Sequence, residues 1–208
     1  MNTVPFNRSF WSENQSRYVE RAMKSAHLSG DGPFTKEVSN TLSEVHGGSP
    51  VLLTTSCTAA LEMCALLLDI QPSDEVIVPS FTFVSSANAF VLAGATIVFV
   101  DIDPFTFNID PIEVEKAITT KTRAVVAVNY GGANAVTPEL NRVILEHDLI
   151  LIEDNAHGLF SSSDGRALGT NSALGTLSFH ESKNVTCGDG GALVVNDSRF
   201  FERAEIIR

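Results

Sequence analysis

From residue 51 onward, the chain alternates between short β-branched runs and stretches of helical spacing, and this alternation limits its possible folds more than any other feature. The runs are apolar on both faces, as in strands that are buried on both sides. Such strands, separated by helices, predict an α/β fold: a three-layer sandwich around a mostly parallel sheet. Strands are expected at 51–54, 75–78, 96–100, 124–128 and 149–152, and helices at 58–68, 84–92, 111–118 and 138–146.

Both ends of the chain depart from this alternation. Residues 174–179 and 192–195 read as two strands, and the loop between them leaves no room for a crossover helix. Part of the sheet is therefore expected to be antiparallel. Near the start, Ser12 can cap a helix that runs to about Ala26, and a second helix is expected over 35–45.

Charge and cysteine usage exclude several classes of protein. Fourteen basic side chains against 25 acidic ones give a net charge of −11, and we expect no nucleic-acid or membrane partner. No apolar run approaches the roughly 18 residues of a membrane span, and residues 1–6 do not resemble a secretory signal. The three cysteines form no C-x-x-C pair, which fits a reducing cytoplasm.

Ligands of open α/β sheets bind at the carboxyl ends of the strands, so the residues after each strand are the candidates for chemistry. The familiar fingerprints are missing: the chain has no G-x-G-x-x-G after a strand, no G-x-x-x-x-G-K-[ST], no G-x-S-x-G and no H-E-x-x-H. The five histidines show no metal-ligand spacing, and we expect no metal site.

Small and hydroxyl residues follow the first strand, from Thr55 to Ala60. Here Ser56 and the free N–H groups of the next helix's first turn can hold a phosphate, which the helix dipole favours. The alternative is that Ser56 only caps the helix.

A second candidate follows the strand at 149–152, where Asp154 stands three residues before His157. A carboxylate at the ligand end of a central strand suits a protonated heterocycle, and the imidazole suits a phenolic oxygen. The alternative is a solvated strand end with a helix cap.

A third candidate is Lys183, which directly follows the strand 174–179 and precedes the glycine-rich run 188–191. The other four lysines lie on polar faces or ends of predicted helices. A desolvated lysine at the mouth of a sheet can form a Schiff base with an aldehyde. A lysine on a surface loop is the alternative.

One cofactor requires all three features. Pyridoxal 5'-phosphate needs a phosphate cradle, an acid opposite its pyridine nitrogen and a lysine for its aldehyde. An aromatic residue stacked on the ring would complete the site, and the segment 79–83 offers Phe81 and Phe83.

The same segments carry a resemblance to a known family, the fold-type I, vitamin B6-dependent sugar-nucleotide aminotransferases (the DegT-like family). It extends through essentially the whole chain. Two segments, 67–72 and 79–85, are similar to the branch that makes dTDP-4-amino-4,6-dideoxygalactose. The other matching segments are 54–63, 94–101, 152–154, 165–170 and 178–184.

The resemblance implies a role for each matching residue. Lys183 would be the catalytic residue, binding the cofactor's aldehyde and moving a proton between the cofactor and C4 of the sugar. Asp154 would pair with the pyridine nitrogen, His157 would bond the ring hydroxyl and Phe83 would stack on the ring. The phosphate would be held by Thr58, Ala59 and Ser178.

The resemblance further implies the large domain of fold-type I transferases and a homodimer that transaminates a dTDP-4-keto-6-deoxyhexose with glutamate. The product would serve surface polysaccharide such as lipopolysaccharide. For the anionic nucleotide, Arg166 and the segment near Ser29 and Gly30 are candidate contacts.

Two departures from the family bear on organisation and activity. Asp189 stands where near relatives have Glu, and the chain ends at Arg208, where family members continue into a smaller domain. The expected organisation is a helical segment (1–50) packed on a PLP-binding large domain (51–208), with the small domain absent. One alternative is a truncated or split-gene fragment that binds cofactor without turnover. Another is a sugar dehydratase, in which histidine replaces the lysine, so Lys183 argues against it.

Overall fold

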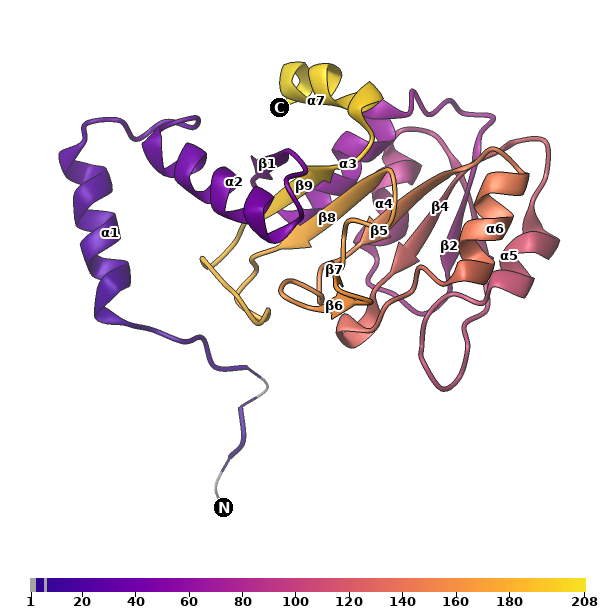
Figure 1. Cartoon of the computed structure of the whole chain (residues 1–208), viewed down its shortest axis with the longest axis horizontal. Helices are drawn as coiled ribbons and strands as arrows, with labels where there is room; N and C mark the ends of the chain where they lie inside the picture. Colours follow the sequence, from indigo (N-terminus) through magenta and orange to yellow (C-terminus); the bar gives the residue numbers. More distant parts are fainter. Residues whose placement is uncertain (1–2, 6) are drawn as a thin grey trace.

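The computed structural model describes residues 3–5 and 7–208, and it has a seven-stranded sheet at its centre (Figure 1). Residues 1, 2 and 6 of the segment considered as a signal lie outside the described residues. The order of the strands across the sheet is β1-β9-β8-β5-β4-β2-β3. Their bounds are β1 Val51–Thr54, β2 Glu75–Pro79, β3 Thr96–Val100, β4 Thr122–Val128, β5 Ile150–Asp154, β8 Leu174–Ser178 and β9 Gly191–Val195.

The five strands from β3 to β8 are parallel, and β9 is antiparallel to both of its neighbours. The predicted α/β sandwich and its antiparallel part are therefore confirmed. Strand β9 lies between β8 and β1 and runs in the opposite direction to both. Strand β1 is therefore an edge strand that pairs antiparallel with β9, with Val51 opposite Val194. The local pattern of β1 does not reveal this pairing, because it depends on a partner about 140 residues away.

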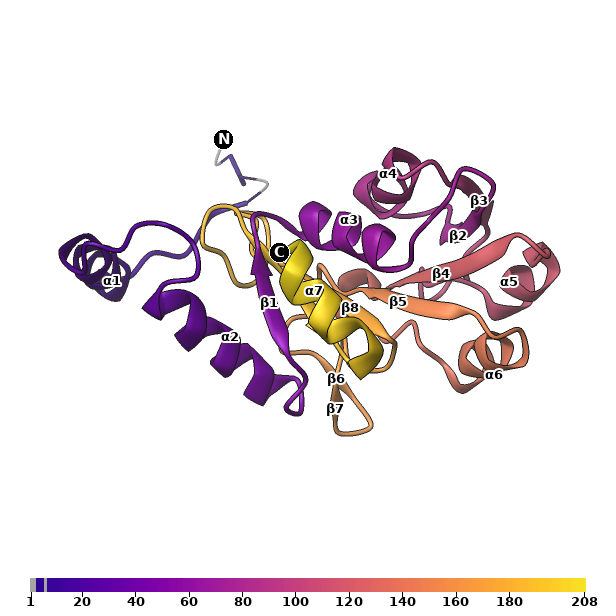
Figure 2. The same ribbon diagram turned by 90° about the horizontal axis from the view of Figure 1, so that it is seen from above.

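Helices cover both faces of the sheet (Figure 2). One face packs against α3 (Cys57–Leu67), α4 (Ser85–Leu92) and α7 (Phe201–Ile207). The other packs against α5 (Pro111–Ala117) and α6 (Pro138–Glu146), with α2 (Pro33–Val45) over the β1 end. Strand β5 shows the alternation: Ile152 lies in the α3 core and Leu151 in the α5–α6 core. Both sides of the sheet are therefore apolar, as the sequence predicts.

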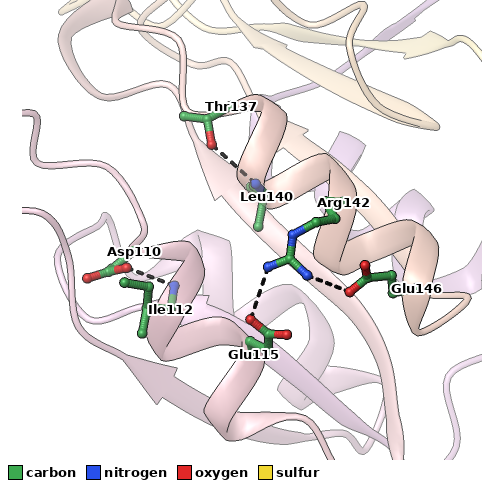
Figure 3. A network of polar contacts seen from close by, with 7 residues as sticks. All are labelled: Asp110, Ile112, Glu115, Thr137, Leu140, Arg142 and Glu146. Atoms are coloured by element: carbon green, nitrogen blue, oxygen red, sulfur yellow. Dashed lines mark hydrogen bonds and ion pairs between the residues drawn. The ribbon is translucent and has the colours of Figure 1, made fainter.

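Helices α5 and α6 begin in the same way and are tied together at the surface (Figure 3). Asp110 and Thr137 cap the two helices, each accepting a backbone N–H two or three residues on, and a proline follows each cap. Arg142 of α6 bonds Glu146 on its own helix at 2.5 Å and Glu115 of α5 at 3.2 Å. These side chains are about half exposed, so solvent screens the bridge and it contributes little to stability.

Helix α1 (Glu13–Lys24) differs from all of these, because none of its residues is buried. It lies apart from the sheet in both views (Figures 1 and 2). Ser12 precedes it, as predicted, and the backbone N–H of Ser12 donates to the Gln15 side chain at 3.0 Å.

A short hairpin between β5 and β8 is not predicted by the sequence. Its strands, β6 (Ser162–Ser163) and β7 (Arg166–Ala167), have two residues each, too few for a periodic pattern. The chain then crosses β8 so closely that a Cβ at Gly175 would lie 2.2 Å from the carbonyl oxygen of Gly169. Among the described residues, no helix is long and apolar enough to span a membrane.

Candidate functional site

The carboxyl edge of the sheet brings the sequence-predicted residues together on the face covered by α3 and α4. Strand β5 ends at Asp154 and β8 ends at Ser178, and both side chains are buried. Side chains alternate along a strand, so Asp154 faces α4 while its neighbour Glu153 points to the opposite face. The first turns of α3 and α4 begin beside this edge.

The first turn of α3 has both a helix cap and a backbone N–H without an acceptor inside the helix. Ser56 caps the helix, accepting the N–H of Ala59 at 3.0 Å, so the N-cap alternative is realised. That bond occupies the Ala59 N–H, whereas the N–H of Thr58, at the second helical position, has no acceptor within the helix. The Thr58 hydroxyl donates to Ser85 of α4 at 2.8 Å. Beneath the turn, a Cβ at Gly191 would lie 2.3 Å from the Cys57 nitrogen, so only glycine allows this close packing.

Asp154 is held by donors on each of its carboxylate oxygens. The Ser86 hydroxyl donates to Oδ2 at 2.6 Å, and the backbone N–H of Ala156 donates to Oδ1 at 3.2 Å. A carboxylate has about four acceptor positions, so two remain free. Asp154 is 4% exposed, and within the described residues it has no cationic partner.

His157 lies next to Asp154 and is oriented by the backbone. The N–H of Gly131 donates to its Nδ1 at 3.3 Å, which leaves the proton of the neutral ring on Nε2. Burial lowers the pKa of His157, the positive charge of Lys183 lowers it further, and Asp154 opposes them. The ring is therefore neutral near pH 7 and presents an N–H donor.

Lys183 lies in the loop between β8 and β9. Its backbone N–H closes a turn onto His180 at 2.9 Å, and Asn184 fastens the loop to the Leu159 carbonyl at 2.7 Å. The lysine is half-buried and forms no ion pair within the part of the chain that the structure describes. Its charge acts on the pKa values of both His157 and Cys57, as does the charge of Asp154. The lysine and the carboxylate therefore share one electrostatic environment.

Aromatic residues line the same edge in two different states. Phe83 is 73% exposed, and it stacks on no other ring in the described chain. Phe81 instead packs against Tyr130, with ring centroids 4.7 Å apart, and Tyr130 meets His157 at 5.3 Å. Phe83 is thus free to cover a ligand, whereas Phe81 packs on Tyr130, which in turn packs on His157.

Two hydroxyl residues between the predicted positions were missed by sequence reasoning. Ser86 contacts Asp154, and Thr82 lies 2.8 Å from the Ser86 hydroxyl. Their spacing of four residues at the start of a helix is the only signal in the sequence. Ser178 is buried at the end of β8, and its hydroxyl accepts the His180 N–H at 3.4 Å.

Arg166 does not belong to this edge. Its guanidinium donates to the Thr170 carbonyl at 3.0 Å, and it lines a cavity of about 720 Å³ together with His46 and Asn196. Asn196 follows the end of β9, at the edge where β8 begins. Arg166 therefore lies away from the carboxyl edge, which corrects the prediction that it contacts a ligand there.

Comparison with known sequences finds a match between this chain and an aminotransferase family. The DegT/DnrJ/EryC1/StrS aminotransferase family matches residues 11–208. The spore coat polysaccharide biosynthesis protein SpsC of Bacillus subtilis is 32% identical over 204 residues, which cover 98% of this chain and 52% of that protein. The chain thus spans about half the length of the curated relatives it matches.

Solved structures give the same picture. The protein named "putative sugar aminotransferase Spr1654" of Streptococcus pneumoniae, in its PMP form, has a TM-score of 0.93 and 29% identity, covering 99% of this chain and 57% of that one. The same protein has been solved in a PLP form, with a TM-score of 0.90. DesI, in the presence of its TDP-sugar product, is 35% identical with a TM-score of 0.88, covering 96% of this chain and 50% of that one.

Proposed function

Because the chain belongs to the DegT/DnrJ/EryC1/StrS aminotransferase family, we propose that it binds pyridoxal 5'-phosphate at the carboxyl edge and transaminates a nucleotide-linked keto sugar. One observation carries the proposal: Asp154, Lys183 and the first turn of α3 converge at that edge. In this account, residues 51–208 form the cofactor-binding domain.

The residues at the edge fit this cofactor. Asp154 is a buried carboxylate with acceptor positions to spare and no cation beside it in the described chain, so a ring N–H would complete it. The first turn of α3, with the Thr58 N–H and the buried Ser178 nearby, suits a phosphate. Lys183 has no ion-pair partner among the described residues, which leaves its amine for an aldehyde.

Each residue then has a task. The bound cofactor supplies an electron sink for negative charge that develops at the substrate carbon. Asp154 accepts the ring N–H, and His157 presents its Nε2–H to the ring hydroxyl. Lys183 would hold the cofactor at its aldehyde through Nζ, and the same amine would serve as the base that takes up and returns the substrate proton. Phe83, exposed and free of other rings, covers the face of the ring.

We further propose that the acceptor is a dTDP-4-keto-6-deoxyhexose, that glutamate is the donor, and that the active form is a cytoplasmic homodimer. The resemblance of segments 67–72 and 79–85 supports this acceptor, as does the likeness to DesI with its TDP-sugar product. Likeness to a polysaccharide biosynthesis protein supports a role in surface polysaccharide. The net charge of −11 opposes an anionic nucleotide at long range, so local donors must bind it.

Absorbance spectroscopy tests the proposal in two stages. The purified protein should bind added cofactor, and glutamate should then convert it to the pyridoxamine form. Addition of the keto sugar should restore the first spectrum, and NMR of the product would give the configuration at C4. Binding without conversion would favour the non-catalytic alternative, and absence of binding would refute the proposal.

A further inference from the structure

The first turn of α4 holds a buried hydroxyl directly on the site carboxylate. Ser86 is 0% exposed and donates to Asp154 Oδ2 at 2.6 Å, a short distance typical of a hydroxyl bonded to an ionised group. A serine has one hydroxyl proton, and this contact uses it. The Thr82 hydroxyl, 2.8 Å away, must therefore donate to the Ser86 oxygen. The result is a directed chain of donors from Thr82 through Ser86 to the carboxylate.

This chain restrains the carboxylate from a separate element of the fold. Asp154 ends β5, while Ser86 belongs to the helix after β2, so their contact joins residues 68 positions apart. Ala156 fixes the other oxygen from within the local backbone. With both oxygens held, the carboxylate cannot rotate about its own bond without losing a donor. The two free acceptor positions of Asp154 therefore point in a fixed direction.

The neighbouring serine links the same helix turn to the other end of the site. The Ser85 oxygen accepts the Thr58 hydroxyl of α3 at 2.8 Å. Two consecutive serines thus connect the start of α4 to the first turn of α3 on one side and to Asp154 on the other.

We propose that Ser86 is a positioning residue, which aims the free acceptor positions of Asp154 at the ring nitrogen of the cofactor, with Thr82 orienting its hydroxyl. This inference rests on the proposed function, because it needs a cofactor with a ring N–H. It adds to that function a requirement for a buried hydroxyl at a position that contacts neither phosphate nor aldehyde.

A chemical double-mutant cycle tests the proposal. The dissociation constants of pyridoxal 5'-phosphate and of its 1-deaza analogue, in which a C–H replaces the ring nitrogen, are measured by absorbance titration with wild type, Ser86→Ala and Ser86→Thr. Loss of a hydrogen bond to a charged group should weaken binding of the natural cofactor to Ser86→Ala about tenfold. Binding of the deaza analogue should not change, and Ser86→Thr, which keeps the hydroxyl, should restore the natural affinity.

The outcomes separate the possible failures. If wild type binds neither compound, the proposed function fails. If wild type binds but Ser86→Ala loses affinity for both compounds equally, or for neither, the positioning role is wrong. Should Ser86→Ala not fold in a denaturant titration, Thr82→Val serves in its place, because it removes only the outer donor of the chain. It should weaken binding of the natural cofactor alone, by about threefold.

Discussion

Glu153 and Asp154 are consecutive residues at the end of β5, and both are buried, yet their surroundings differ. Glu153 is 0% exposed and receives four donors at its acceptor positions, one of which, the Ser172 hydroxyl, shares its single proton with the Leu174 carbonyl. The donors are the Asn129 side chain, the backbone N–H groups of Gly169 and Asn171, and the Ser172 hydroxyl. Asp154 accepts two and keeps two positions free.

The difference separates an anchor from a site. A carboxylate saturated by donors from a loop fixes that loop, and here Glu153 fastens the segment after the β6–β7 hairpin across the sheet. A buried carboxylate with free positions has unmet acceptor capacity, which a ligand can fill. Glu153 should therefore matter for stability and Asp154 for binding and chemistry.

The largest effect is expected at the lysine that accompanies Asp154. Lys183→Ala should abolish transamination, because no other lysine among the described residues follows a strand at the carboxyl edge to hold the aldehyde or carry the proton. Rates are measured with glutamate and keto sugar, with Lys183→Arg as a matched control that keeps the charge without a nucleophilic amine. Appreciable turnover by either variant would contradict the role of Lys183.

Next in size is the loss of the anchor. Glu153→Ala leaves three donors without this acceptor, while the Ser172 hydroxyl keeps the Leu174 carbonyl, so the free energy of unfolding should fall by about 3–5 kcal/mol. Denaturant titration measures this. The variant that remains folded should bind the cofactor as wild type does. If its stability were unchanged while its cofactor affinity dropped, the assignments of the two acids would have to be exchanged.

Asp154→Asn is expected to reduce activity rather than stability, and by a smaller free energy than Glu153→Ala reduces stability. The amide keeps the shape but loses the charge that would face the ring N–H, so transamination should fall by roughly a hundredfold, or about 2.7 kcal/mol. The free energy of unfolding, measured in the same way as for Glu153→Ala, should change by less than about 1 kcal/mol. A variant with full activity would show that Asp154 does not contact the ring.

The pH dependence of stability tests the surroundings of Glu153, because the charge of Glu153 acts on the pKa of the buried His46. His46 is 1% exposed, and desolvation lowers its pKa below the usual 6.5, although Glu153 and the Leu42 carbonyl act in the opposite direction. The unfolded chain therefore binds the proton first as pH falls. Stability is full above about pH 6.5 and decreases below it, by up to about 1.4 kcal/mol per pH unit for this group.

His46→Phe should flatten that decrease. The Leu42 carbonyl keeps the backbone N–H of residue 46 as a donor, at 3.0 Å, so the variant leaves no orphaned carbonyl. Part of the slope should persist, because the pKa of His157 is lowered as well. Unfolding free energies at pH 7.5 and 5.5 test this. An unchanged difference between the two would show that His46 does not titrate in this range.

Most of the fold could be predicted because its strands are buried on both faces and read as apolar runs, while capped helices separate them. The features that the sequence did not predict are either non-local or short. The partner of β1 depends on the reversal of β9, and the two-residue strands of the hairpin carry no periodicity.

The residues of the site can likewise be divided into those that the local sequence predicts and those that depend on non-local contacts. Asp154 and Lys183 could be predicted because ligand-binding residues follow strands, whatever those strands pair with. Ser86 could not, because it reads as an ordinary first-turn serine until the fold brings β5 beside it. Nor does the sequence distinguish Glu153 from Asp154 by saturation, since the donors of Glu153 come from residues up to 24 positions away.

In the proposed function, Lys183 holds pyridoxal phosphate at the carboxyl edge of the sheet. Borohydride reduction of the protein mixed with the cofactor, followed by peptide mass spectrometry, tests this most directly, because reduction makes the lysine adduct permanent. We expect a single phosphopyridoxyl group, on Lys183. An adduct confined to any of the other four lysines, or no adduct at all, would contradict it.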